Sequence, residues 1–102
     1  MSWLKDVLVA AAHALRERLG RPPTVGEVAA LLRAMGIRVQ AEKLVETLDE
    51  LVEEGKLVYI VNMLISAGKG APTEVHIVPL TEPSAQLLEI VRRYALVAGR
   101  SR

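Results

Sequence analysis

Cysteine and phenylalanine are absent from this chain of 102 residues, and its aromatic residues are Trp3, Tyr59 and Tyr94. Without cysteine the chain has no disulfide framework, no thiolate nucleophile and no cysteine-based zinc or iron–sulfur site. Three aromatic rings are also too few for a platform on which single-stranded nucleic acid could stack. The absences therefore exclude thiol chemistry and disfavour single-strand binding.

Long hydrophobic runs are also absent. No apolar run reaches the roughly 18 residues of a membrane-spanning helix, and the first residues do not resemble a secretory signal. We therefore expect a cytoplasmic protein. With 51% hydrophobic and 25% charged residues, the chain is predicted to fold as one domain over residues 1–102. Asparagine occurs once and glutamine twice, a scarcity that is one trend of thermophile proteins.

Residues suited to catalysis do not form a recognisable constellation. His13 stands among alanines and His76 in an expected strand, and no serine is placed as a nucleophile. The neighbouring carboxylates Glu50, Glu53 and Glu54 lack histidines at metal-ligand spacing. We predict that the protein is not an enzyme and binds neither a metal nor a cofactor.

Hydrophobic periodicity predicts four helices, at residues 3–19, 24–35, 41–54 and 84–98. A glycine suited to a left-handed cap follows each of these four helices: Gly20, Gly36, Gly55 and Gly99. The segment beginning Thr24-Val25-Gly26-Glu27 has the form of a capping box, which marks the start of the second helix.

Between the third and fourth helices the pattern changes to that of strands. Residues 56–65 are rich in β-branched side chains, and residues 73–80 alternate apolar and polar side chains. The intervening residues 66–72 contain glycine and proline suited to a turn. We predict an antiparallel hairpin, and hence an α+β fold.

The order of three helices, a hairpin and a last helix resembles the winged-helix family of repressors. The resemblance is carried by Thr24–Leu32 and by Leu48–Val58, where the pattern Leu-x-x-Leu-x-x-x-Gly-x-Leu ends the third helix. It implies a winged helix-turn-helix fold in which the hairpin is the wing. The segment between Ala29 and Leu48 is longer than in compact repressors, which leaves the register of the third helix open.

The resemblance also implies a site for duplex DNA, with the third helix in the major groove and the wing on the backbone. The matching positions are Arg38, Gln40, Lys43 and Thr47, with Lys69 at the wing tip. The alternative is that these are ordinary surface residues.

The charge pattern favours a second function. Residues 42–56 contain six acidic residues against Lys43 and Lys56, a local charge of −4, whereas the whole chain carries +1. Proteins that neutralise phosphates usually carry a basic stripe. Either the acids face solvent on a flank, or the third helix binds a basic protein surface. The alternative function is an interaction module of a larger assembly that binds another protein through its acidic third helix or its apolar terminal helices.

The first and last helices have more apolar positions than one buried face needs. Large exposed apolar patches usually mark an interface, so we predict a homodimer. In the alternative, these helices cover each other and the hairpin. The predicted interface residues are Trp3, Val7, Ala10, Ala14, Leu88, Val91, Tyr94 and Ala95.

Overall fold

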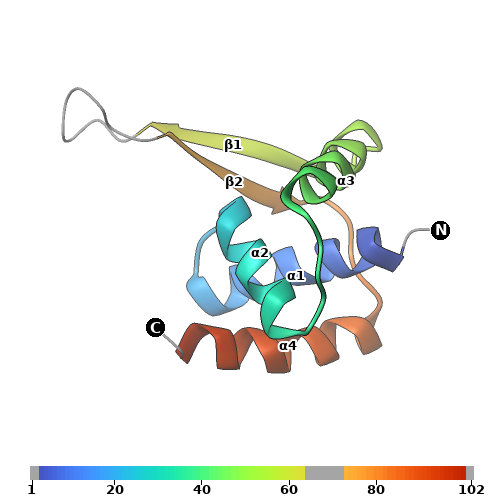
Figure 1. Cartoon of the computed structure of the whole chain (residues 1–102), viewed down its shortest axis with the longest axis vertical. Coiled ribbons are helices and arrows are strands. Elements are labelled where there is room, and N and C mark those ends of the chain that lie inside the picture. The colour runs from blue at the N-terminus through green and yellow to red at the C-terminus, as the bar shows by residue number, and fades with distance from the viewer. Residues whose placement is uncertain (1–2, 64–72, 101–102) are drawn as a thin grey trace.

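The computed structural model describes residues 3–63 and 73–100, and shows an α+β fold with four helices and an antiparallel hairpin (Figure 1). This confirms the predicted order of elements. The observed bounds differ from the predicted ones by at most two residues, and the predicted end of the first strand at residues 64–65 lies outside the described residues. The elements are α1 (Trp3–Leu19), α2 (Val25–Ala34), α3 (Ala41–Glu53), β1 (Leu57–Met63), β2 (Thr73–Pro79) and α4 (Ala85–Arg100).

The predicted glycine caps are confirmed at three positions and wrong at one. Gly20, Gly36 and Gly55 have φ angles of +73°, +80° and +76°, which residues with a side chain rarely adopt. Gly99 lies inside α4, which continues to Arg100. One glycine within a helix costs only about 1 kcal/mol relative to alanine, so it need not end the helix.

The capping box at the start of α2 is confirmed in both directions. The Thr24 hydroxyl accepts a hydrogen bond from the Glu27 backbone N–H at 3.1 Å, and the Glu27 carboxylate accepts one from the Thr24 N–H at 2.9 Å. Arg21 donates two further bonds to this carboxylate, at 2.9 and 2.7 Å. The Arg21 guanidinium is the main reason that the pKa of Glu27 falls to about 2.

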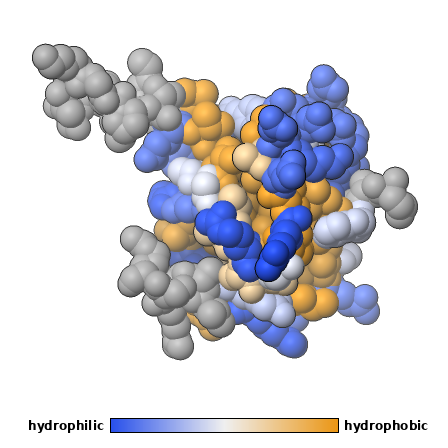
Figure 2. All heavy atoms as spheres, viewed as in Figure 1, coloured by the Kyte–Doolittle hydropathy of each residue, from blue (hydrophilic) through white to orange (hydrophobic). Residues whose placement is uncertain are grey.

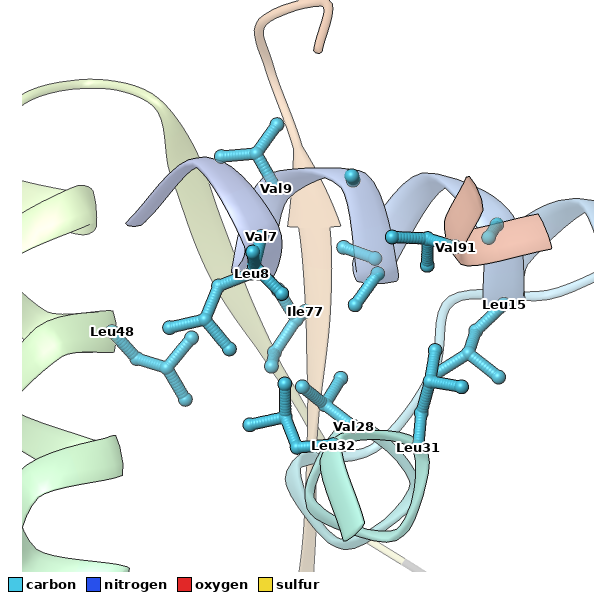
Figure 3. Close-up of a cluster of buried hydrophobic side chains, with 14 of the residues drawn as sticks. Val7, Leu8, Val9, Leu15, Val28, Leu31, Leu32, Leu48, Ile77 and Val91 are labelled. Carbon is cyan, nitrogen blue, oxygen red and sulfur yellow. The ribbon is translucent and has the colours of Figure 1, made fainter. Parts of the chain in front are cut away.

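Helix α1 lies at the centre of the core, with side chains buried on every side over residues 7–12. A helix that is hydrophobic all round must be enclosed by other elements. Figure 3 shows how this is achieved: Leu48 of α3, Ile77 of β2 and Leu31 of α2 all point toward α1, and Val91 reaches it from α4.

The hairpin is a two-stranded sheet in which Tyr59 lies opposite Ile77. The segment before α2 lies along the outer edge of β2, because Thr24 forms a bridge with His76 and the Ile77 N–H donates to the Pro23 carbonyl at 2.8 Å. The hairpin is therefore tied to the helices through β2, and within the described residues β1 forms the other edge of the sheet.

Helix α4 lies beside α1 and runs in the same direction (Figure 1). Arg92 of α4 donates two hydrogen bonds to the Glu17 carboxylate of α1, at 2.9 and 2.8 Å. His13 Nε2 donates to the Thr81 carbonyl at 2.7 Å, which fastens the segment before α4 onto α1. None of the helices in the described part of the chain is long and apolar enough to cross a membrane.

This packing corrects most of the predicted dimer interface. Val7, Ala10, Ala14, Val91 and Ala95 are all buried within the single chain, at 7% exposure or less. The apolar stripe that we expected on the surface of α1 is covered by other elements of the chain, among which α4 has the most extensive contact with α1. The corresponding positions of α4 face α1, so these five residues are not available to a second copy in this conformation.

Candidate functional site at helix α3

Helix α3 packs one narrow stripe against the core, formed by Leu44, Leu48 and Leu51. Thr47 belongs to the same stripe and is only 4% exposed. Its hydroxyl donates a hydrogen bond to the Lys43 carbonyl, one turn earlier in the helix, at 2.8 Å. The expectation that Thr47 is an exposed contact to DNA is therefore wrong, since its spacing places it on the buried face and its polar atom is already satisfied.

The outward face of α3 carries a continuous line of exposed carboxylates. Glu42, Glu46, Asp49 and Glu53 follow one another at intervals of four, three and four residues, which places them on one side of a helix. None of the ion pairs among residues 3–63 and 73–100 includes any of the four. We call these four residues the acidic stripe. Val45 lies beside it and is 47% exposed.

The remaining acids of this region are neutralised within the chain. Lys5 of α1 lies 3.3 Å from a Glu50 carboxylate oxygen and 2.5 Å from one of Glu54, and Lys56 lies 3.6 Å from the other Glu54 oxygen. Lys5 is the main reason that the pKa of Glu54 is lowered. Lys5 and Lys56 thus offset the negative charges of Glu50 and Glu54, whereas no ion pair among the described residues offsets the charges of the acidic stripe.

Strand β1 adds apolar surface next to the acidic stripe. The Tyr59 hydroxyl donates a hydrogen bond to Asp49 at 2.6 Å, and partial burial together with this bond raises the pKa of Tyr59. Val61 follows two residues later on the same face of the strand and is 58% exposed. The end of the hairpin farther from α3 extends beyond the helices (Figure 1). The hydrogen bond between Tyr59 and Asp49 therefore joins β1 to the edge of the acidic stripe, and Val45 and Val61 add exposed apolar side chains on α3 and β1.

The predicted DNA-contact residues are partly brought together. Arg38, Gln40 and Lys43 are exposed and, with Thr47, line a hollow of about 470 Å³ at the start of α3. Trp3 and Lys5 of α1 also line this hollow. Lys69 lies outside the described residues.

A larger hollow of about 740 Å³ adjoins it, between the end of α2 and the start of α3. Figure 2 shows hydrophilic residues gathered over α3 and hydrophobic residues below it on this side of the molecule. Sequence reasoning missed this hollow, because it forms between two helices whose separation is set by the linker. Its main lining residues are Leu32, Arg33, Ile37, Arg38, Val39 and Leu44.

Some apolar surface remains on the outer side of the terminal helices. Trp3 and Tyr94, both predicted interface residues, are 56% and 40% exposed, and Leu88 is half-buried. Ile90 and Leu96 of α4 are each 48% exposed. On the terminal helices, the apolar surface open to a second copy is therefore narrower than predicted and lies mainly on α4.

Histidine and carboxylate side chains do not gather into a metal-binding group among the described residues. His13 and His76 each hydrogen-bond to a backbone carbonyl, of Thr81 and Pro22 respectively. No family model matches the chain, and neither a curated protein nor a solved structure matches it. Inferences about function therefore depend on the geometry of α3 and its surroundings.

Proposed function

We propose that the chain is a winged-helix domain that binds another protein through the outer face of α3. The order of three helices, a hairpin and a fourth helix supports this fold. In the winged-helix layout the third helix and the wing form the binding surface. The corresponding surface here is the angle between α3 and β1, and its chemistry indicates the kind of partner.

The acidic stripe is the observation that carries the proposal. A helix in the major groove lies between two phosphate backbones, so its exposed side chains meet negative charge on both sides. Four carboxylates that form no ion pair among the described residues oppose such an approach from the outward face. The same charges attract a basic protein surface, speed its association and orient it.

The apolar residues beside the acidic stripe fit a protein partner as well. Protein interfaces commonly combine an apolar centre with a polar rim, and aromatic residues are enriched in them. Val45 and Val61 are both about half exposed, and Tyr59 lies between α3 and the exposed part of β1. The proposed partner is therefore a basic surface with apolar side chains at its centre.

A labelled amphipathic peptide with lysines flanking a row of leucines provides a direct test by fluorescence anisotropy. We expect it to bind the protein, and the double variant Glu46→Gln/Glu53→Gln to bind about two- to fivefold more weakly for each charge removed. Glu82→Gln is the matched control, because Glu82 is exposed and makes no ion pair among the described residues. Equal binding by the double variant and the control would refute the proposal.

Duplex DNA is the second candidate partner. It is favoured by Arg33, Arg38 and Lys43, which are exposed around the start of α3 and take part in no ion pair of the described residues. In this alternative the N-terminal end of α3, rather than its outward face, contacts the duplex. A mobility-shift assay separates the candidates, because binding to phosphates weakens steeply as salt rises. A shift that disappears on Arg38→Gln but survives Glu46→Gln would favour DNA.

Self-association is proposed through the outer side of α4. Ile90 and Tyr94 are one turn apart and both are exposed, so they form an apolar strip suited to a two-fold contact. Sedimentation equilibrium is expected to show a dimer, and Ile90→Glu/Tyr94→Glu is expected to be monomeric. A wild-type protein that remains monomeric at high concentration would exclude the dimer.

A further inference from the structure

The hollow of about 740 Å³ between α2 and α3 takes no part in the proposed protein contact. Its volume lies within the roughly 300–1,000 Å³ of typical small-molecule sites. Such sites are usually apolar, with a few polar groups that fix the orientation of the ligand. The lining residues follow this pattern.

The deeper part of the hollow is apolar. Leu32 and Leu44 are 2% and 4% exposed, and Ile37 and Val39 are half-buried. Gly36, with its positive φ, turns the chain out of α2 so that Ile37 and Val39 lie beside the hollow. This part of the hollow suits the hydrocarbon body of a ligand.

The polar part of the hollow is cationic. Arg33 comes from the last turn of α2 and Arg38 from the linker, and both side chains are exposed. Neither takes part in an ion pair within residues 3–63 and 73–100, and no carboxylate is among the described lining residues. A guanidinium group matches a carboxylate with two parallel hydrogen bonds.

We propose that this hollow binds a small amphipathic carboxylate. The hydrocarbon body of the ligand lies against Leu32 and Leu44, and its carboxylate meets Arg33 and Arg38. A cationic ligand would meet like charge here, and a compact inorganic anion would leave the apolar part of the hollow in contact with water. The site is separate from the acidic stripe, so this proposal does not depend on the protein-binding function.

The first test compares 4-phenylbutyrate with the neutral 4-phenylbutan-1-ol, which has the same hydrocarbon body. Titrations are followed by the backbone amide resonances of the full chain. We expect 4-phenylbutyrate to shift the amides of residues 32–44 and the alcohol to bind about tenfold or more weakly. Equal affinities would refute the role of the arginines, and no shift in residues 32–44 would refute the site.

Arg33→Gln/Arg38→Gln is the decisive variant, and Arg18→Gln is its control, because Arg18 is exposed on α1 outside both hollows. We expect the double variant to lose at least tenfold in affinity for 4-phenylbutyrate and the control to match the wild type. Trp3 lines only the smaller of the two hollows. A ligand-induced change in Trp3 fluorescence, with amide shifts at residues 38–43 and none at residues 32–37, would place the ligand there and overturn the proposal. If the double variant does not fold, the comparison of 4-phenylbutyrate with 4-phenylbutan-1-ol on the wild-type protein tests the proposal by itself.

Discussion

Helices α1 and α3 differ in how much of their surface packs against the rest of the molecule. Around α1, other elements pack on all sides, and its side chains are buried without interruption from Val7 to Ala12. Helix α3 contributes one stripe to the core and leaves an acidic face outside. The side chains of α1 are therefore restricted to those that pack against the surrounding elements. The outward residues of α3 are free of packing constraints and can contact a partner.

The starts of α2 and α3 also differ, because side chains cap the first turn of α2 and no side-chain capping bond is made at the start of α3. The first turn of α2 is held by side chains of Thr24, Glu27 and Arg21. At the start of α3, Gln40 occupies the N-cap position and makes no capping hydrogen bond with its side chain. Glutamine is not among the residues preferred there. The polar residues around the start of α3 are thus not arranged for maximal helix stability.

The largest expected effect comes from truncating the buried face of α1. Leu8 is 1% exposed, so Leu8→Ala removes core contacts and leaves a cavity, at a cost of about 2–5 kcal/mol. Val45→Ala, on the outer side of α3, is expected to change the free energy of unfolding by less than about 0.5 kcal/mol. Urea unfolding of both variants measures the difference. Similar losses would mean that α3 is covered as fully as α1.

A smaller effect is expected at the start of α2, and it depends on pH. The folded pKa of Glu27 is about 2, below its ordinary value of 4.5, so its charge stabilises the fold above pH 4.5. Glu27→Gln keeps an acceptor for Thr24 and removes the ion pair with Arg21, at a cost of about 1 kcal/mol at neutral pH, allowing for solvent screening. Urea unfolding should show this difference shrinking as the pH falls from 4.5 toward 2. A difference that is constant with pH would exclude the ion pair as its source.

The start of α3 offers the converse experiment. Gln40→Ser places a hydroxyl where it can accept a hydrogen bond from the first turn, and we expect the protein to gain about 0.5–1 kcal/mol in thermal or urea unfolding. Gln40→Ala is the control and should give no gain. If serine does not stabilise the helix, the first turn of α3 is already satisfied in another way.

The elements themselves were largely predictable because the spacing of apolar residues reports directly on which side of each element is buried. The spacing predicts one inner stripe of α3 from Leu44, Val45, Leu48, Leu51 and Val52. This is confirmed for the three leucines and is wrong for Val45, which is 47% exposed. Thr47 was not assigned to this stripe, because a polar side chain in an apolar stripe suggests exposure. Its hydroxyl instead bonds to its own helix, a local interaction that spacing does not reveal.

The surface of the terminal helices could not be predicted in the same way. The second apolar stripe of α1 could be covered by another part of the chain or by a second copy, and the pattern is the same in both cases. The structure resolves this for Val7, Ala10 and Ala14, because all three are buried within the single chain, in which α4 packs along α1. The hollow edged by Arg33 and Arg38 likewise depends on how the linker places two helices.

The smallest expected effect bears most directly on why α3 carries acids on its outer face. Glu46 has like charges one turn away on both sides, at Glu42 and at Asp49, and such pairs destabilise a helix by about 0.2–0.5 kcal/mol each. We therefore expect Glu46→Gln to raise the free energy of unfolding by a few tenths of a kcal/mol at about 0.01 M salt, and the gain to disappear at about 1 M salt, where charges are screened.

Urea titrations at the two salt concentrations provide the measurement, with Glu82→Gln as the control that should show no gain. A loss of stability in Glu46→Gln would mean that this carboxylate has a structural role within the single chain. A gain would mean that the acidic stripe lowers the stability of the isolated domain. In that case its charges are not explained by the stability of the fold, which agrees with the proposed attraction of a basic partner.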